Sequence, residues 1–263
     1  MVIHKPNIMQ QVTPKKALGQ HFLTDEEIAR RIVDSLQASS HQVLEIGPGM
    51  GVLTRYLLQR SDINLRVVEI DRESVAYLQQ HFPALDDRIL SADFLKLPLA
   101  DLYPESVCII GNFPYNISSQ ILFKILENKD LVPETVGMFQ KEVAERVASA
   151  PGKKMYGILS VLLQAFFDIK YLFTVHEHSF NPPPKVKSAV IRITRNPEKR
   201  LHCDEVLFKN VVKTAFNQRR KTLRNSLKTF TFTSDFKENE LLSKRPEQLS
   251  VAEFETICEN IVS

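Results

Sequence analysis

The stretch Val43-Leu44-Glu45-Ile46-Gly47-Pro48-Gly49-Met50-Gly51 decides the fold of this 263-residue chain. Its first four residues predict a buried strand of a parallel sheet. Glycines at alternate positions follow, and they allow a sharp turn and a close approach of the backbone to a ligand. A helical pattern of apolar residues begins at Val52. This order of strand, glycine loop and helix is typical of doubly wound α/β folds.

The spacing of these glycines narrows the kind of ligand. The dinucleotide pattern G-x-G-x-x-G is not met, because Val52 stands where its third glycine would be. The observed pattern is E-x-G-x-G-x-G, from Glu45 to Gly51. It argues against a pyrophosphate cradle, and so against a nicotinamide dehydrogenase. It favours a nucleoside-bearing ligand without phosphates.

Two acids farther along the chain fit such a ligand. The next predicted strand, residues 65–69, ends in Glu69, 22 positions after Gly47 (69 − 47). An acid about 20 residues beyond a glycine loop accepts hydrogen bonds from ribose hydroxyls; a helix cap or a surface acid is the alternative for Glu69. A third strand leads to Asp93 and Phe94. Asp93 could accept from an adenine amino group, with Phe94 against the ring, although a capping role is the alternative for Asp93.

A second motif presents polar groups at the end of a strand. The apolar run at residues 107–110 predicts a buried strand, and Gly111-Asn112-Phe113-Pro114-Tyr115 follows it. Adenine N6 is a poor nucleophile because its lone pair is delocalised into the ring. The Asn112 side-chain oxygen and the backbone carbonyl next to Pro114 could localise that lone pair, while Tyr115 stacks on the base. A plain turn is the alternative interpretation, but the glycine loop upstream favours a site.

The alternation of elements predicts the fold class and the domains. Seven predicted strands alternate with helices as far as Asn196, and the last two form a hairpin-like pair. We therefore predict an α/β fold, a Rossmann-like doubly wound sheet with a reversed edge strand. From Cys203 onward the pattern is helical. Residues 1–197 are thus expected to form the ligand-binding catalytic domain, and residues 198–263 a small all-α domain.

Three local features lead to further expectations. Residues 1–20 carry several lysines and little pattern, and we expect a mobile basic arm. Thr24 and Glu27 predict a capping box at the start of the following helix. The proline-rich segment at residues 180–186 predicts a stiff loop. Phe180, which begins it, is either a core residue or a second face for a flipped base.

Composition indicates a soluble globular protein, with 43% hydrophobic and 25% charged residues. The longest apolar run is far shorter than the roughly 20 residues that span a bilayer, and the N-terminus lacks the apolar segment of a secretory signal. Cys108, Cys203 and Cys258 are widely spaced and suggest neither a zinc site nor a disulfide framework. His176 and His178 lack a third ligand, so no metal is expected. We expect a cytoplasmic protein without a membrane partner.

The charge is distributed unevenly. The net charge is +3, but seven Lys or Arg and no Asp or Glu occur between Val206 and Ser234. A solvated helix face usually alternates signs, whereas a block of one sign indicates a polyanionic partner.

Four segments together resemble a known family. EIGPGMG, GNFPY, FNPPPKVKSAV and AFNQRRKTLRNSL occur in this order between about Lys16 and Leu227. They resemble the class I ribosomal RNA adenine dimethyltransferases that use S-adenosyl-L-methionine, and most of all the bacterial 16S branch. That resemblance implies dimethylation of N6 on two adjacent adenosines in the 3′-terminal hairpin loop of 16S rRNA. It also implies a monomer that acts on the immature 30S subunit and not on DNA.

The resemblance also implies roles for individual residues, position by position. Two positions depart from the family, which usually has Asn at the position of His21 and Leu at that of Phe113. The implied catalytic residues are Asn112, Phe113, Pro114, Tyr115 and Phe180. The implied cofactor-binding residues are His21, Leu23, Gly47, Gly49, Gly51, Glu69, Asp93, Phe94 and Asn112. The implied RNA-binding residues are Arg219, Arg220, Lys221 and Arg224.

Two rival functions follow from the same motifs. A large-subunit rRNA adenine methyltransferase of the antibiotic-resistance type would share the catalytic loop. A non-catalytic RNA-binding or ribosome-assembly factor could use the same scaffold, although the intact glycine loop and acids argue against a loss of activity.

Overall fold

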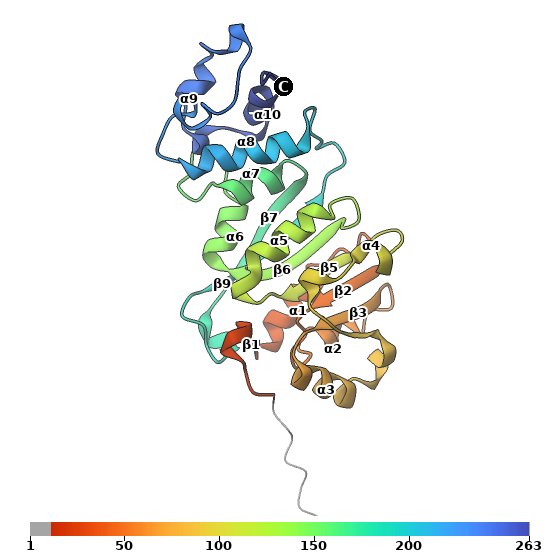
Figure 1. The fold of residues 1–263 in the computed structure, drawn as a ribbon. Coiled ribbons are helices and arrows are strands. Elements are labelled where there is room, and N and C mark those ends of the chain that lie inside the picture. The colour runs from red at the N-terminus through yellow and green to blue at the C-terminus, as the bar shows by residue number, and fades with distance from the viewer. Residues whose placement is uncertain (1–11, 263) are drawn as a thin grey trace, which may run out of the picture.

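A seven-stranded sheet forms the centre of the molecule (Figure 1). The computed structural model describes residues 12–262, and residues 1–11 and 263 lie outside its description. The strand order is β4-β3-β2-β5-β6-β9-β7. The neighbouring strands from β4 to β6 are parallel, and β9 is antiparallel to both β6 and β7. The strands are β2 (Gln42–Ile46), β3 (Asn64–Glu69), β4 (Ile89–Ser91), β5 (Cys108–Asn112), β6 (Glu134–Gln140), β7 (Phe167–Val175) and β9 (Ser188–Arg195).

This topology confirms the predicted doubly wound fold and refines one detail. The reversed strand, β9, lies one position in from the edge, and β7 forms the edge itself. The predicted hairpin-like pair is therefore real, but its second strand is inserted between β6 and the first strand of the pair.

Helices cover both faces of the sheet and bury its alternating side chains. On β2, Val43 belongs to one apolar cluster and Leu44 to the other, as expected for a strand whose successive side chains point to opposite faces. The helices of this part are α1 (Glu26–Asp34), α2 (Thr54–Leu57), α3 (Arg72–His81), α4 (Leu99–Leu102), α5 (Ser118–Glu127), α6 (Lys141–Val147) and α7 (Ile158–Gln164).

The N-terminal segment differs from the sequence prediction. A short strand β1 (Phe22–Leu23) pairs with β8 (Phe180–Asn181) in a separate two-stranded sheet that was not predicted. Residues 12–20 are not a free arm, because Val12 is buried and Lys15 forms an ion pair with Glu73 at 3.0 Å. The rest of the predicted arm lies outside the described residues.

The predicted capping box of α1 is wrong, and the N-cap lies one residue later than Thr24. Asp25 is the N-cap, and its carboxylate accepts a hydrogen bond from the Ile28 amide at 3.1 Å. The Thr24 hydroxyl instead donates to the carbonyl of Ser179 at 3.1 Å. It thereby ties the entry of α1 to the segment just before β8.

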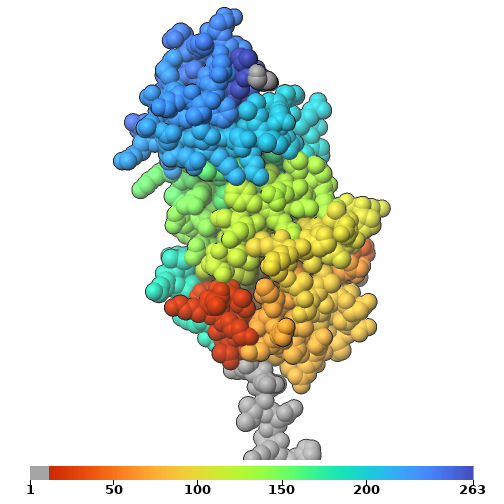
Figure 2. Space-filling view, in the orientation of Figure 1, coloured from red at the N-terminus to blue at the C-terminus, as the bar shows by residue number. Residues whose placement is uncertain are grey.

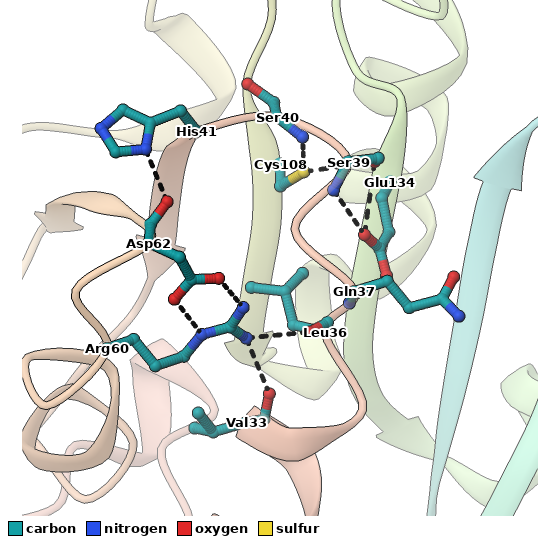
Figure 3. Close-up of polar contacts among 10 residues, drawn as sticks. All are labelled: Val33, Leu36, Gln37, Ser39, Ser40, His41, Arg60, Asp62, Cys108 and Glu134. Carbon is teal, nitrogen blue, oxygen red and sulfur yellow. Dashed lines mark hydrogen bonds and ion pairs between the residues drawn. The ribbon is translucent and has the colours of Figure 1, made fainter.

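A buried polar network fixes the amino-terminal edge of the sheet, opposite the glycine loop (Figure 3). The Glu134 carboxylate is 1% exposed and accepts hydrogen bonds from the amides of Gln37 at 2.9 Å and Ser39 at 3.3 Å. The Ser40 amide donates to the sulfur of Cys108 at 3.2 Å, and burial raises the pKa of this thiol. The network holds the connection between α1 and β2 in place, so this edge has a structural role.

The C-terminal part is helical and shares the core of the sheet part. It contains α8 (Glu205–Asn217), α9 (Leu223–Ser226) and α10 (Val251–Glu259), joined by short 3₁₀ turns. Leu163 of α7 lies in the same apolar cluster as Phe208 and Phe254. Figure 2 shows these helices at one end of an elongated molecule and the N-terminal segment near the other. The division after residue 197 coincides with the end of the sheet, but as a boundary between domains it stays a prediction.

Among the helices of residues 12–262, none has the length and apolar character that a membrane span requires.

Candidate active site

A cavity of about 190 Å³ opens at the carboxyl ends of β2, β3 and β5. This is the edge at which doubly wound sheets bind ligands. Most of the predicted site residues line it, although the segments that carry them are distant in sequence. The lining includes His21, Gly47, Gly49, Glu69, Asp93, Phe94, Asn112, Phe113, Pro114 and Tyr115.

Three of the predicted catalytic and cofactor-binding residues lie elsewhere. Leu23 lines a smaller cavity of about 30 Å³, which also borders Gly47 and Asn112. Gly51 lines neither cavity and packs against the ring of Phe82. Phe180 is 4% exposed and belongs to the apolar core. The expectation that its ring faces a flipped base is wrong in this structure, because the pairing of β1 with β8 covers it.

The glycine loop forms the floor of the cavity. Gly49 has φ +56°, a region that residues with a side chain rarely adopt, and a Cβ there would lie 2.8 Å from the ring of Phe22. The Gly49 amide donates to Oε2 of Glu69 at 3.1 Å. This hydrogen bond holds the loop against Glu69, the acid that the sequence predicts to act together with it.

Glu69 is neither a helix cap nor a surface acid. Its side chain is buried, it lines the cavity, and its Oε1 accepts from the amide of Asp71 at 2.9 Å. Asp71 is the N-cap of α3. Burial raises the pKa of the Glu69 carboxyl, and the two backbone donors partly offset that effect. Each carboxylate oxygen has a second lone pair, so Glu69 can still accept from a ligand hydroxyl.

Asp93 caps a turn and also lines the cavity, so its proposed contact with an adenine amino group stays a prediction. One of its oxygens accepts from the amide of Leu95 at 2.9 Å and caps a 3₁₀ turn, and the residue also lines the cavity. The ring of Phe94 is buried beside it, with the ammonium group of Lys124 5.1 Å from the ring centroid.

Asn112 is oriented by the N-terminal segment. Its Nδ2 donates to the backbone carbonyl of His21 at 2.9 Å, which fixes the amide so that Oδ1 is the free acceptor. The Phe113 amide donates to the carbonyl of Met138 at 3.1 Å, so the backbone here is held by β6. Within residues 12–262 neither Asn112 Oδ1 nor the Phe113 carbonyl has a protein donor. Two acceptors are thus presented side by side at the cavity.

The Phe113 ring points away from the cavity into a slot made by two glycines. Gly111 and Gly137 are paired across β5 and β6, and a Cβ on either would collide with this ring. The ring is 1% exposed and packs edge-on against Phe139, with centroids 4.9 Å apart. Phe113 in place of the usual Leu therefore alters packing in the core, while the backbone carbonyl of Phe113 stays at the site.

Tyr115 is packed between two partners. Its hydroxyl is hydrogen-bonded to that of Ser188, and burial raises the pKa of the phenol. The imidazole of His21 stacks on its ring, with centroids 5.3 Å apart and planes at 30°. Nδ1 of His21 lies 2.8 Å from the carbonyl oxygen of Pro182.

The four predicted RNA-binding residues fall into two pairs. Arg219 donates to the carbonyl of Lys154 at 2.7 Å, and Arg224 donates to that of Lys237. Both also lie within 4 Å of a carboxylate. Arg220 and Lys221 are exposed and form no ion pair within the described residues. Only this second pair is fully available to a phosphate.

Two residues beside the cavities were not among the predicted site residues. Phe22 borders both cavities and packs on the glycine loop, a role that depends on the unpredicted β1. Glu45, the first residue of the glycine motif, is buried, and burial raises its pKa to about 8 while the Thr54 hydroxyl donates to it at 2.6 Å. Within residues 12–262 no cluster of acids, histidines or cysteines could hold a metal ion.

Comparison with known proteins decides the family. A family model described as Ribosomal RNA adenine dimethylase matches residues 12–261. The chain belongs to this family. A protein of Parabacteroides distasonis named Ribosomal RNA small subunit methyltransferase A is 61% identical over 249 residues, which cover 94% of this chain and 93% of that protein. One of the same name from Cytophaga hutchinsonii is 58% identical over 248 residues, 94% of this chain and 96% of that protein.

Two solved structures are similar to this chain in fold. A dimethyladenosine transferase from Plasmodium falciparum is 25% identical, with a TM-score of 0.75, and the match covers 89% of this chain and 94% of that one. The 23S rRNA methyltransferase ErmE is also 25% identical, with a TM-score of 0.69, over 91% of this chain and 100% of that one.

Proposed function

We propose that this family member transfers methyl groups from S-adenosyl-L-methionine to N6 of two adjacent adenosines in the 3′-terminal hairpin loop of 16S rRNA. The products would be N6,N6-dimethyladenosines, formed during biogenesis of the small ribosomal subunit. The observation that carries the proposal is the pair of free acceptors, Asn112 Oδ1 and the Phe113 carbonyl, at the mouth of a cavity floored by the glycine loop.

The residues around the cavity fit the cofactor. Glu69 offers free lone pairs to ribose hydroxyls, Asp93 an oxygen to the adenine amino group, and Phe94 an apolar wall to the adenine ring. Gly49 leaves no space for a side chain between Phe22 and the loop, so backbone alone faces the methionine part. When bound, the cofactor supplies a methyl group already activated by its sulfonium, so the protein contributes mainly orientation.

The residues after β5 fit the target base. Asn112 Oδ1 and the Phe113 carbonyl would accept the two N6 hydrogens and turn the nitrogen lone pair toward the cofactor. His21 covers one face of the Tyr115 ring, so the base would stack on the part of the ring that His21 leaves uncovered. Taking a base out of its stack costs a few kcal/mol, less in an RNA loop than in a duplex. Stacking on an aromatic side chain returns about 1–3 kcal/mol per base.

The nearest alternative substrate is the large subunit, as for ErmE, the 23S rRNA enzyme. The small subunit is favoured because relatives at 57–61% identity carry the small-subunit name, whereas ErmE is 25% identical. Labelled cofactor, offered with unmodified 30S or with 50S particles, distinguishes the two. We expect label in the 30S RNA alone; label in the 50S RNA would exclude our assignment. If neither RNA is labelled, the non-catalytic assembly factor becomes the favoured interpretation of the function.

The partner and compartment follow from this assignment. We propose that the protein acts as a monomer on the immature 30S subunit in the cytoplasm, and that Arg220 and Lys221 contact RNA phosphates. Such contacts set position and orientation without reading sequence. Arg219 and Arg224 are placed to hold these residues in position, since each bonds to a backbone carbonyl of another segment.

Reversal of both free charges, Arg220→Glu with Lys221→Glu, should weaken RNA binding. Each lost phosphate contact lowers the salt dependence of log K by about 1, so the slope should fall by about 2. The matched control is Lys170→Glu with Arg200→Glu, an equal change of charge at two exposed residues outside the block. Filter binding of 30S particles at several salt concentrations measures both quantities. Equal slopes for the two double variants would show that the segment just before α9, which carries Arg220 and Lys221, does not contact the RNA.

A further inference from the structure

The two acceptors described above hold N6 but cannot keep its proton, because an amide oxygen and a peptide oxygen are very weak bases. We propose that the imidazole of His21, through Nε2, takes the proton that leaves N6 when the methyl group arrives. This inference rests on the proposed function and adds a proton acceptor to it.

The surroundings of His21 fix its tautomer. Nδ1 lies 2.8 Å from the Pro182 carbonyl oxygen, which can only accept a hydrogen bond. Nδ1 must therefore carry the hydrogen, and in the neutral ring Nε2 is left with a free lone pair. A neutral imidazole in this tautomer is a base.

The position of His21 matches that role. Its backbone carbonyl holds Nδ2 of Asn112 at 2.9 Å, so the histidine adjoins the residue whose Oδ1 would bind N6. Its ring stacks on Tyr115 and lines the cavity. The residue is also partly exposed, so a proton on Nε2 has a route to solvent. Stacking on an aromatic face stabilises the charged ring during this passage.

The other titratable side chains of the cavity already have protein partners, and Glu69 and Asp93 are assigned to the cofactor under the proposed function. Both oxygens of Glu69 accept from backbone amides, and Asp93 caps a turn. The Tyr115 hydroxyl is bonded to Ser188.

The ionisable groups near His21 carry charges of both signs. The segments packed around it, residues 12–24, 111–119 and 180–188, carry no carboxylate. Their remaining ionisable groups are Tyr115, Lys15, Lys16, Lys185 and Lys187, and Lys15 is ion-paired with Asp71 and Glu73. Glu69 and Asp93 line the same cavity as His21. Nε2 has no hydrogen-bond partner within residues 12–262, and the residue is partly exposed, so a proton taken there can pass on to water.

The step balances in atoms and charge. As the new N6–carbon bond forms, the carbon–sulfur bond of the donor breaks and the positive charge moves to N6. The N6–H bond then breaks, its electron pair stays on nitrogen, and the proton forms a bond to Nε2. The imidazolium gives this proton to water, which leaves a neutral amine ready for the second methyl group.

Single-turnover methylation of 30S particles at saturating cofactor, measured between about pH 5.5 and 8.5, tests the proposal. The wild-type rate should fall on the acid side, because a proton on Nε2 removes the lone pair that acts as the base. His21→Asn, which can still donate to Pro182, should lose this acid limb and run at least about tenfold slower at pH 7.5, because water replaces the base. His178→Asn, at an exposed histidine outside the cavity, should behave as wild type. An unchanged acid limb in His21→Asn would overturn the proposal, while an inactive wild type would overturn the proposed function itself.

A second readout is independent of turnover, and it decides the matter if His21→Asn folds poorly. Nitrogen-15 NMR of the histidines in the wild-type protein should show that the neutral ring of His21 carries its hydrogen on Nδ1. A hydrogen on Nε2 would remove the lone pair and contradict the proposal.

Discussion

Alanine at position 112 should lower the rate of methyl transfer by about 10²–10³-fold, the loss typical when one preorganised hydrogen-bonding group is removed from a reacting centre. Asn112 Oδ1 is one of the two acceptors proposed for N6, and its orientation depends on the bond from Nδ2 to the His21 carbonyl. The dissociation constant for the cofactor should change by less than about threefold, because Glu69 and Asp93 are untouched and only the reacting end loses a contact.

The matched control is Asn116→Ala, which removes the same amide from the same loop. The Asn116 side chain donates to the carbonyl of Ala17 at 3.3 Å and has no proposed contact with N6. Single-turnover rates on 30S particles and calorimetric titration of the cofactor measure the two effects separately. Wild-type turnover in Asn112→Ala would exclude the alignment role, and equal losses in both variants would point to general damage of the loop.

Gly137→Ala should destabilise the fold and disturb the site together. A Cβ at Gly137 would overlap the ring of Phe113 and lie 2.8 Å from that of Phe139. Overpacking of this kind costs about 1–3 kcal/mol, because rings and backbone must shift. The Phe113 carbonyl would move with its ring, and a misplacement near 1 Å can cost about 10²-fold in rate.

A second substitution separates this clash from other effects. Phe113→Leu replaces the ring with a smaller branched side chain, so the double variant Gly137→Ala with Phe113→Leu should recover most of the lost stability. Gly157→Ala serves as the control, since the nearest atom to a Cβ there is 3.9 Å away. Urea unfolding of the wild type, the two single variants Gly137→Ala and Phe113→Leu, and the double variant gives the coupling between positions 137 and 113. Additive losses in the double variant would show that the ring does not fill the glycine slot.

The parts of the fold that could be predicted were those encoded by local pattern. Buried strands such as 43–46 and 107–110 are short apolar runs followed by glycine or polar loops, and the structure has strands at both. Glu69, Asp93 and Asn112 could be assigned to one site because parallel strands end at the same edge of a sheet.

The predictions that failed depend on contacts between residues far apart in the sequence, or on a choice between two adjacent residues. Thr24 and Asp25 are both good N-caps, and only the bond of Thr24 to Ser179 removes it from that role. The burial of Phe180 follows from its pairing with Leu23, far away in the sequence. Likewise, nothing in the local sequence indicates that the Arg219 side chain donates a hydrogen bond to the backbone carbonyl of Lys154.

The central claim is that one amide oxygen and one peptide oxygen hold adenine N6 for two successive methyl transfers. Its most direct test is mass spectrometry of 16S rRNA from unmodified 30S particles, after incubation with the protein and S-adenosyl-L-methionine. The account predicts two adjacent N6,N6-dimethyladenosines in the 3′-terminal fragment, and none when Asn112→Ala replaces the wild type over the same interval. Methyl groups on another atom or another RNA, or equal product from the variant, would contradict it.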